Sequence, residues 1–266
     1  MFFVGVISLD SHKVKDLVNK GNEFFHQGKF EEAIRCYDEA LALKPDYSEA
    51  LFNKGTALCE LGKLREAISF FDKVLEINPQ DWEALHNKGN ALLNLCCFKE
   101  SLECYSRALE LNPKDAETMY NKGNLLLRLG KFEEAAKLFD EALALNPQMA
   151  AASLNKALAL LVFHETLSCD DAISNVDAVL ETLESVWSEK NLSPEIVQRF
   201  KTDIPFIMIQ VIQNLAQVCG SEASASVVGI KKLLIKILGK QEYQGFIKRT
   251  NLEIHPEATI YRDILK

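Results

Sequence analysis

Apolar residues between positions 14 and 47 recur three and four positions apart, on both sides of a break at Gln27-Gly28-Lys29. This spacing is typical of the buried stripe of an amphipathic helix. The second stretch stops at Lys44-Pro45, because proline lacks an N–H donor and restricts the residue before it. The pattern therefore predicts two helices that form a hairpin.

The same hairpin pattern returns at a constant step along the chain. An Asn-Lys-Gly triplet places glycine at positions 21, 55, 89 and 123, each 34 residues after the last, and the terminal proline recurs as Pro79, Pro113 and Pro147. A fixed period of this length is typical of a stacked array, in which each unit buries its apolar face against its neighbours.

Two further sets of positions keep the same step. Small residues stand where two helices must approach closely; beside the glycines they are Ala33, Ala67, Ser101, Ala135, Ala40, Ala108 and Ala142, with the larger Val74 at one position. Aromatic rings recur at Tyr37, Phe71, Tyr105 and Phe139. We expect these rings to fill the gaps between neighbouring hairpins.

This combination of period, small residues, ring and terminal proline over residues 14–147 closely resembles the tetratricopeptide repeat (TPR) family. The resemblance implies an all-α fold, a right-handed superhelical array of helical hairpins. The chain departs from the family pattern at its early tryptophan, which is replaced by Leu17, Leu51, Leu85 and Met119. The third copy also has Cys96-Cys97 where the others have Gly-Lys. If the backbone there has a positive φ, this loop is strained; a redox switch is the alternative role for the two cysteines, and plain reduced loop residues are favoured.

The repeats divide the chain into segments. We expect an N-terminal leader at 1–13, four repeats at 14–47, 48–81, 82–115 and 116–149, a degenerate fifth repeat at 150–190 and a helical C-terminal cap at 191–266. Ser193-Pro194 is a good helix start, and Pro205 is expected to break or kink the helix after it. The amphipathic stretch 227–238 has lysines on one side and could bind a membrane, but docking by its apolar face is favoured.

Composition limits the function. The net charge of −8 argues against binding to nucleic acid, because no excess of cations is available to neutralise phosphates. The seven cysteines lack the even, dense spacing of a disulfide framework, which indicates a reducing compartment. The apolar first nine residues are too short to span a membrane and lack the features of a secretion signal. We therefore expect a cytoplasmic protein, with a membrane partner disfavoured.

The sequence carries no convincing catalytic or metal-binding motif. Its five histidines form no His-x-x-x-His pair, and it has no Cys-x-x-Cys. Each Gly-Lys pair follows its triplet glycine too late, and without the Ser or Thr, for a phosphate-binding loop. We expect no cofactor, no metal and no enzyme activity.

The resemblance implies that the first helix of each hairpin lines a concave groove. A polar stripe should face this groove, formed by Asn19, Asn22, Asn53, Thr56, Asn87, Asn90, Asn121, Asn124 and Asn155. Asparagine is a poor residue inside a helix, so its repetition needs a reason beyond family inheritance. A side-chain amide can pair with both the N–H and the C=O of a peptide backbone. The stripe is similar to the asparagine ladders by which the TPR domains of O-GlcNAc transferase and kinesin light chain hold extended segments.

Residues beside this stripe should select side chains of the bound segment. Aromatic residues and glutamates fall at the flanking positions, namely Phe52, His86, Tyr120, Glu49, Glu83 and Glu117. The glutamates favour a basic segment. The family's clamp for carboxy-terminal carboxylates needs several cations, and Lys15 and Arg128 alone do not form it, so we expect weak binding of acidic tails.

The predicted function is a non-catalytic protein-interaction scaffold or adaptor that binds an extended, basic peptide segment of a protein partner in the groove. One alternative is a regulatory subunit or assembly factor that acts through its C-terminal helices on an enzyme or a membrane surface. Self-association through the repeat ends is a third option. The regular copies resemble the near-consensus TPR proteins of archaea and bacteria.

Overall fold

The computed structural model describes residues 3–162, 169–188 and 192–249. These residues form α-helices and one short 3-10 helix, and no strand occurs among them. The predicted all-α fold is therefore confirmed. The helices fall into two compact units, which divide between Leu125 and Leu126 and are described separately below.

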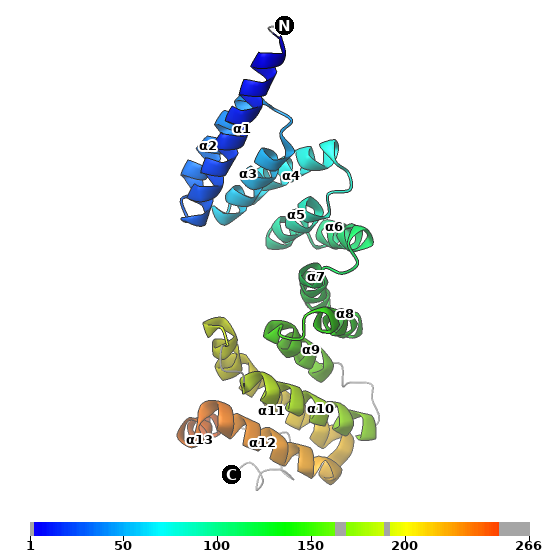
Figure 1. Cartoon of the computed structure of the whole chain (residues 1–266). Coiled ribbons are helices and arrows are strands. Elements are labelled where there is room, and N and C mark those ends of the chain that lie inside the picture. The colour runs from blue at the N-terminus through cyan, green and yellow to red at the C-terminus, as the bar shows by residue number, and fades with distance from the viewer. Residues whose placement is uncertain (1–2, 163–168, 189–191, 250–266) are drawn as a thin grey trace. The chain divides into compact units, whose positions relative to one another are not determined.

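The first unit is a series of helical hairpins. Its helices are α1 (Phe3–His26), α2 (Phe30–Leu43), α3 (Ser48–Glu60), α4 (Leu64–Ile77), α5 (Trp82–Asn94), α6 (Phe98–Leu111) and the part of α7 (Ala116–Arg128) up to Leu125. Within each hairpin the two helices lie side by side, and α2 and α4 also pack against the next hairpin (Figure 1). The segment expected as a leader belongs to α1 from Phe3 onward.

The recurrent glycines let a ring pack onto the helix backbone. A Cβ atom added to Gly89 would lie 2.7 Å from Cε1 of Tyr105, and one added to Gly55 would lie 2.8 Å from Cε1 of Phe71. No side chain fits there without displacing a fully buried ring. The rings of Tyr37, Phe71 and Tyr105 thus pack against the glycine of their own hairpin, a contact that the expected position between neighbouring hairpins did not include.

The turns between the two helices of a hairpin have one unusual residue each. Gly28, Gly62 and Gly130 have φ of 72°, 71° and 72°, in the left-handed region that favours glycine. Cys96 has the same backbone with φ of 59°. The strained loop that the sequence predicted for the third copy is therefore confirmed.

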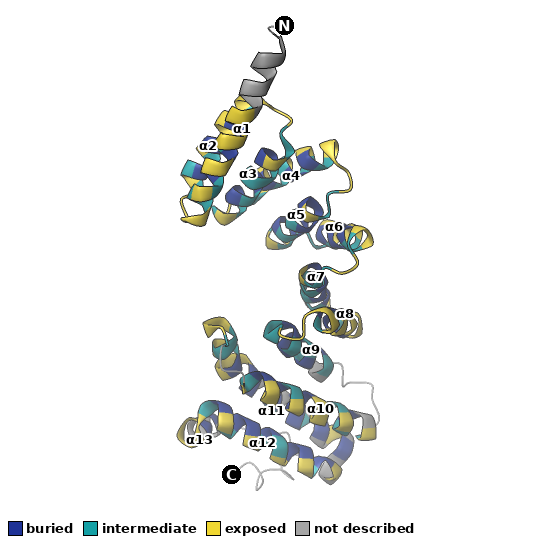
Figure 2. Cartoon of the chain, viewed as in Figure 1, coloured by how far each residue is buried: buried dark blue, intermediate teal, exposed yellow. Residues whose placement is uncertain are grey.

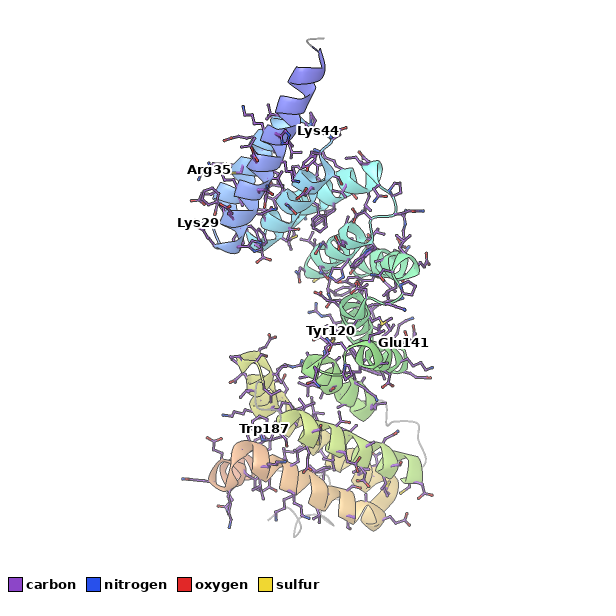
Figure 3. The ribbon with its side chains drawn as sticks, in the orientation of Figure 1. Lys29, Arg35, Lys44, Tyr120, Glu141 and Trp187 are labelled. Carbon is purple, nitrogen blue, oxygen red and sulfur yellow. The ribbon has the colours of Figure 1, made fainter. Side chains whose placement is uncertain are left out.

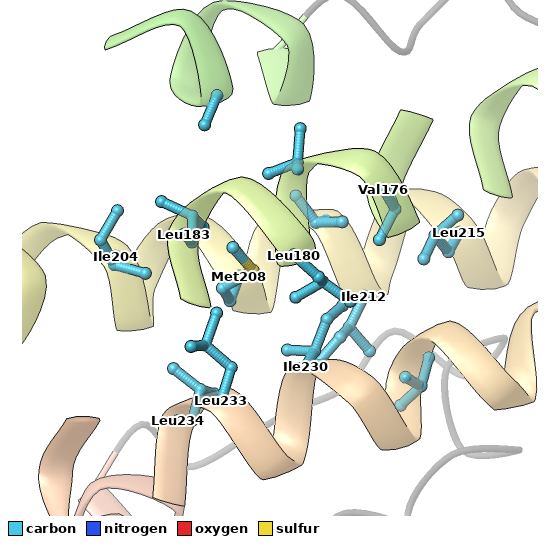
Figure 4. Packing of buried hydrophobic residues seen from close by; sticks show 14 of the residues in the cluster. Val176, Leu180, Leu183, Ile204, Met208, Ile212, Leu215, Ile230, Leu233 and Leu234 are labelled. Carbon is cyan, nitrogen blue, oxygen red and sulfur yellow. The ribbon is translucent and has the colours of Figure 1, made fainter. Parts of the chain in front are cut away.

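The second unit combines a repeat hairpin with a helical bundle. Its helices are the end of α7, α8 (Phe132–Leu145), α9 (Ala150–Val162), α10 (Cys169–Trp187), α11 (Pro194–Cys219), η2 (Gly220–Ala223), α12 (Ser224–Leu238) and α13 (Lys240–Arg249). Leucine, isoleucine and methionine side chains from α10, α11 and α12 interdigitate in its core (Figure 4). Helix α11 runs through Pro205, so the proline does not break the helix, and a kink there stays a prediction. The last part of the predicted cap, 250–266, lies outside the described residues.

Helix α12 contributes its apolar face to this core. Val227, Ile230, Leu233, Leu234 and Ile237 are all buried, whereas the opposite side of the helix is exposed (Figure 2). This burial confirms that α12 docks by its apolar face. Among the described residues, no helix combines the length and the apolar character needed to cross a membrane.

Candidate functional site

The predicted polar stripe follows the first helices of the hairpins in the first unit. Helix α3 contacts both α1 and α5, and stripe residues 31 positions apart are neighbours where hydrogen bonds join them. We call the stripe residues on α1, α3, α5 and α7 up to Leu125 the first-helix face. Its amides are not equivalent, because some of them bond to one another.

Two pairs of asparagines link neighbouring hairpins. Asn53 Nδ2 donates to Asn22 Oδ1 over 2.8 Å, and Asn121 Nδ2 donates to Asn90 Oδ1 over 3.1 Å. Each accepting oxygen also accepts a hydrogen bond from a tyrosine hydroxyl. Tyr37 donates to Asn22 Oδ1 over 2.8 Å, and Tyr105 donates to Asn90 Oδ1 over 2.6 Å. These four amides therefore link neighbouring hairpins.

Burial extends the pH range over which the Tyr37 phenol keeps the proton that it donates. It raises the pKa of Tyr37 to about 12. The hydroxyl stays protonated at neutral pH and can donate to Asn22.

Asn87 differs from the other stripe amides. In each linked pair the donor asparagine stands 31 positions after the acceptor. The position that corresponds to an acceptor for Asn87 is therefore 56, where the chain has threonine. The Thr56 hydroxyl donates back to the Phe52 carbonyl over 3.1 Å. The Asn87 side chain is half-buried, and it bonds to no residue of the described part of the chain. Its donors and its acceptor are thus open to a ligand.

His86 does not have the open position that the sequence predicted. It is only 8 % exposed, because its Nδ1 lies 2.5 Å from Thr118 Oγ1 and its Nε2 lies 2.9 Å from Asn90 Nδ2. Asp115 and Glu117 each place a carboxylate oxygen 3.8 Å from the ring. His86 therefore links the third hairpin to the fourth and offers little surface for selecting a peptide side chain.

Asn155 also departs from the predicted stripe. It is 5 % exposed, and its Oδ1 accepts from Arg199 Nη1 of α11 over 2.8 Å. The sequence could not place Arg199 there, since the two residues are 44 positions apart and belong to different segments of the second unit. Of the remaining predicted residues, Asn19 is exposed, whereas Asn124 and Tyr120 are half-buried. Tyr120 belongs to α7 (Figure 3).

The predicted acidic flank is at the surface. Glu49, Glu83 and Glu117 lie in the first turns of α3, α5 and α7, and all three are exposed. Tyr47 donates its hydroxyl to Glu49 over 3.1 Å. The row gives this end of the first-helix face a negative charge.

A hollow of about 210 Å³ opens between the first and second hairpins. Its walls include the rings of Phe25, Tyr37 and Phe52, and the amides of Asn22 and Asn53 also border it. His26 and Thr56 complete the lining. We call this the α1–α3 hollow. The sequence predicted Phe52, Asn22, Asn53 and Thr56 for this face but missed the other three residues.

Sequence reasoning also missed a repeated ion pair. The lysine of the recurrent Asn-Lys pair meets an aspartate of the preceding hairpin, as Lys54 with Asp38, Lys88 with Asp72 and Lys156 with Asp140. In the last two pairs the lysine Nζ lies 2.5 Å from the aspartate Oδ1. A constant offset of 16 residues between aspartate and lysine is the pattern that could have revealed them.

The described residues offer little for redox or metal chemistry. They contain no group of three or more side chains placed to hold a metal ion. Cys96 is exposed and Cys97 half-buried, and both are free thiols. A redox role for this pair stays untested.

Comparison with known protein families decides the identity. Tetratricopeptide repeat sequences match residues 18–81, 86–150 and 120–163, and a further tetratricopeptide repeat pattern matches residues 70–96. Together these matches cover more than half of the chain. The chain is a tetratricopeptide repeat protein. No curated protein sequence matches this TPR protein.

Solved structures share the fold of this TPR protein. MamA from Desulfovibrio magneticus RS-1, from residue 41 to its end, is 25% identical with a TM-score of 0.57, over 65% of this chain and 96% of that one. PilF of Pseudomonas aeruginosa is 17% identical with a TM-score of 0.62, over 90% of this chain and 99% of that one. YrrB, described as a TPR protein with an unusual peptide-binding site, is 24% identical with a TM-score of 0.53. The match covers 70% of this chain and 91% of YrrB.

Proposed function

We propose that this TPR protein is a non-catalytic interaction scaffold that binds an extended peptide segment of a partner along its first-helix face. TPR proteins are typically scaffolds without catalytic activity, and YrrB carries a peptide-binding site on the same fold. The proposal places the protein in the cytoplasm, where its thiols stay reduced.

The open amide of Asn87 is the observation that carries the proposal. It is a half-buried asparagine inside a helix, where asparagine is intrinsically unfavourable. Asn53 and Asn121 each gain a bond to a neighbouring hairpin, but no described residue bonds to Asn87. A peptide backbone can supply both an N–H and a C=O to this amide.

The acidic flank supports a preference for basic segments. Glu49, Glu83 and Glu117 stand exposed beside the amides, and complementary charge speeds association and rejects like-charged partners. An acidic carboxy-terminal tail should bind weakly for the same reason.

The alternative, action of the C-terminal helices on an enzyme or a membrane surface, gains no support from α12. The apolar face that would make this contact is buried in the core of the second unit. We therefore retain the first-helix face as the proposed site.

Partner capture from native lysate with the whole protein tests the proposal. We expect Asn87→Ala to lose partners that the unchanged protein retains, with an unaltered circular dichroism spectrum, because its amide has no structural bond to lose. Gln80→Ala, which removes an exposed amide from the turn before α5, should retain them. Partners that stay bound to Asn87→Ala would show that recognition lies elsewhere.

A further inference from the structure

The α1–α3 hollow has apolar walls in spite of the amides that border it. The oxygen of Asn22 already accepts two hydrogen bonds, from Tyr37 and Asn53, and the Thr56 hydroxyl donates to its own helix. The Asn22 oxygen, the Asn53 amino group and the Thr56 hydroxyl are thus already bonded within the protein. What it offers to a ligand is mainly the faces and edges of aromatic rings.

Neighbouring rings hold these walls in place. Phe52 packs edge-on against the fully buried Phe71, with ring centroids 5.9 Å apart. Phe25 packs edge-on against Phe30 at 5.3 Å. A preformed cavity binds more tightly than one that must be ordered by its ligand.

The hollow arises from differences between repeat copies. The first, third and fourth copies have Asn22, Asn90 and Asn124 at the register where the second copy has the shorter Thr56. At the next joint, His86 stands at the register of Phe52 and is fixed by Thr118 and Asn90. The volume of about 210 Å³ far exceeds the ~30 Å³ that one water occupies, so the hollow can hold a large side chain.

We propose that the α1–α3 hollow binds one large apolar side chain, aromatic or long aliphatic, of a basic extended peptide. This inference rests on the proposed function, since the same peptide would pair its backbone with Asn87 and its cations with Glu49 and Glu83. Thr56 and Asn87 occupy facing registers of α3 and α5, so the hollow and the open amide are adjacent. The hollow thus determines which residue of a partner is selected.

Two matched heptapeptides test the inference on the full-length protein. Both are acetylated and amidated, with lysines on either side of a central residue that is phenylalanine in one and alanine in the other. Burial of a phenylalanine side chain should make the first peptide bind about tenfold or more tightly than the second. Titrations followed by two-dimensional NMR measure both affinities and show whether Phe25, Phe52 and Thr56 respond.

Thr56→Asn changes both the hollow and the amide, because an asparagine at 56 stands where Asn87 would find the kind of partner that Asn22 gives to Asn53. The test therefore reads the preference between the two peptides and not their absolute affinity. Thr56→Asn installs the residue of the other three copies, so the fold should survive, while the longer side chain occupies the hollow and abolishes the preference for phenylalanine. Thr56→Val keeps the side-chain volume and should keep the preference.

Different outcomes overturn different proposals. Equal binding of the two peptides, weakened for both by Asn87→Ala, would refute the hollow and leave the groove standing. A phenylalanine preference that survives in Thr56→Asn would also refute the hollow. If neither peptide binds at millimolar concentration, both proposals fail.

Discussion

Single residues decide which parts of this repeated surface are available. The sequence predicted the stripe of asparagines from its period, but it did not predict which amides are already bonded. That depends on the side chain at the facing register of the next helix, as with Asn22 for Asn53 and Thr56 for Asn87. The repeat pattern predicts which positions face each other on neighbouring helices. Whether their side chains form a hydrogen bond also depends on the distance between the helices.

Cys96 is the clearest departure at this scale. A residue with a side chain loses about 1–2 kcal/mol of stability when its backbone is in the left-handed region. Glycine has no Cβ atom and avoids part of this cost. We expect Cys96→Gly to raise the free energy of unfolding by about 1 kcal/mol, measured by urea denaturation. The sequence predicted this strain because three other copies have glycine there.

Two controls test the cause. Gly62→Ala should lower stability by a similar amount, since an added Cβ there meets no atom within 4 Å and the cost is purely conformational. Cys96→Ser keeps the strained backbone and should leave stability unchanged. An unchanged or lower urea midpoint for Cys96→Gly would contradict the explanation that the backbone at Cys96 is strained.

Neighbouring hairpins are joined by a recurrent ion pair, which one joint lacks. The ion pairs of Lys54 and Lys88 tie the first helix of one hairpin to the second helix of the hairpin before it. At the next joint Lys122 faces Ser106 instead of aspartate, and the serine hydroxyl bonds back to the Leu102 carbonyl. Helix bounds were largely predictable from proline and glycine, but these joints were not, because they depend on contacts between hairpins.

Restoring the missing pair should strengthen this joint. We expect Ser106→Asp to raise the free energy of unfolding by about 0.2–1 kcal/mol, as for partly exposed ion pairs. Urea denaturation at low salt measures the gain, which should shrink in 1 M salt. Ser106→Asn, which has the same shape without the charge, should show no such salt dependence; equal effects of the two variants would exclude the ion pair.

The whole molecule consists of two units with different kinds of core. The first unit buries small clusters around Tyr37, Leu51 and Leu58, one after another along the array. The second unit has one large core from α9 to α13. The family resemblance predicted the first unit in detail, whereas the cap was predicted only as helical, since its packing follows no repeat.

Loss of packing should therefore stay local. Leu183 is fully buried in the second unit, and we expect Leu183→Ala to destabilise that unit by about 2–5 kcal/mol. Amide hydrogen exchange read by mass spectrometry should become faster in α10–α12 and change little in α1–α4, because each repeat contacts only its neighbours. Phe71→Ala should give the reverse pattern. Equal acceleration in both units would show that they unfold together.

The constant spacing of these contacts has a consequence for how such a chain can change by duplication or deletion. Removal of residues 48–81 would bring Asp38 to Lys88 and Asn22 to Asn87, because each partner recurs after 34 positions. The seam would then carry the same ion pair and the same amide link as the joint it replaces. The deletion would also remove Thr56 and Phe52, and Asn87 would gain an internal partner. Loss of one copy can thus leave folding intact while it removes the means of recognition, so a change in the number of repeats can alter binding specificity without loss of the fold.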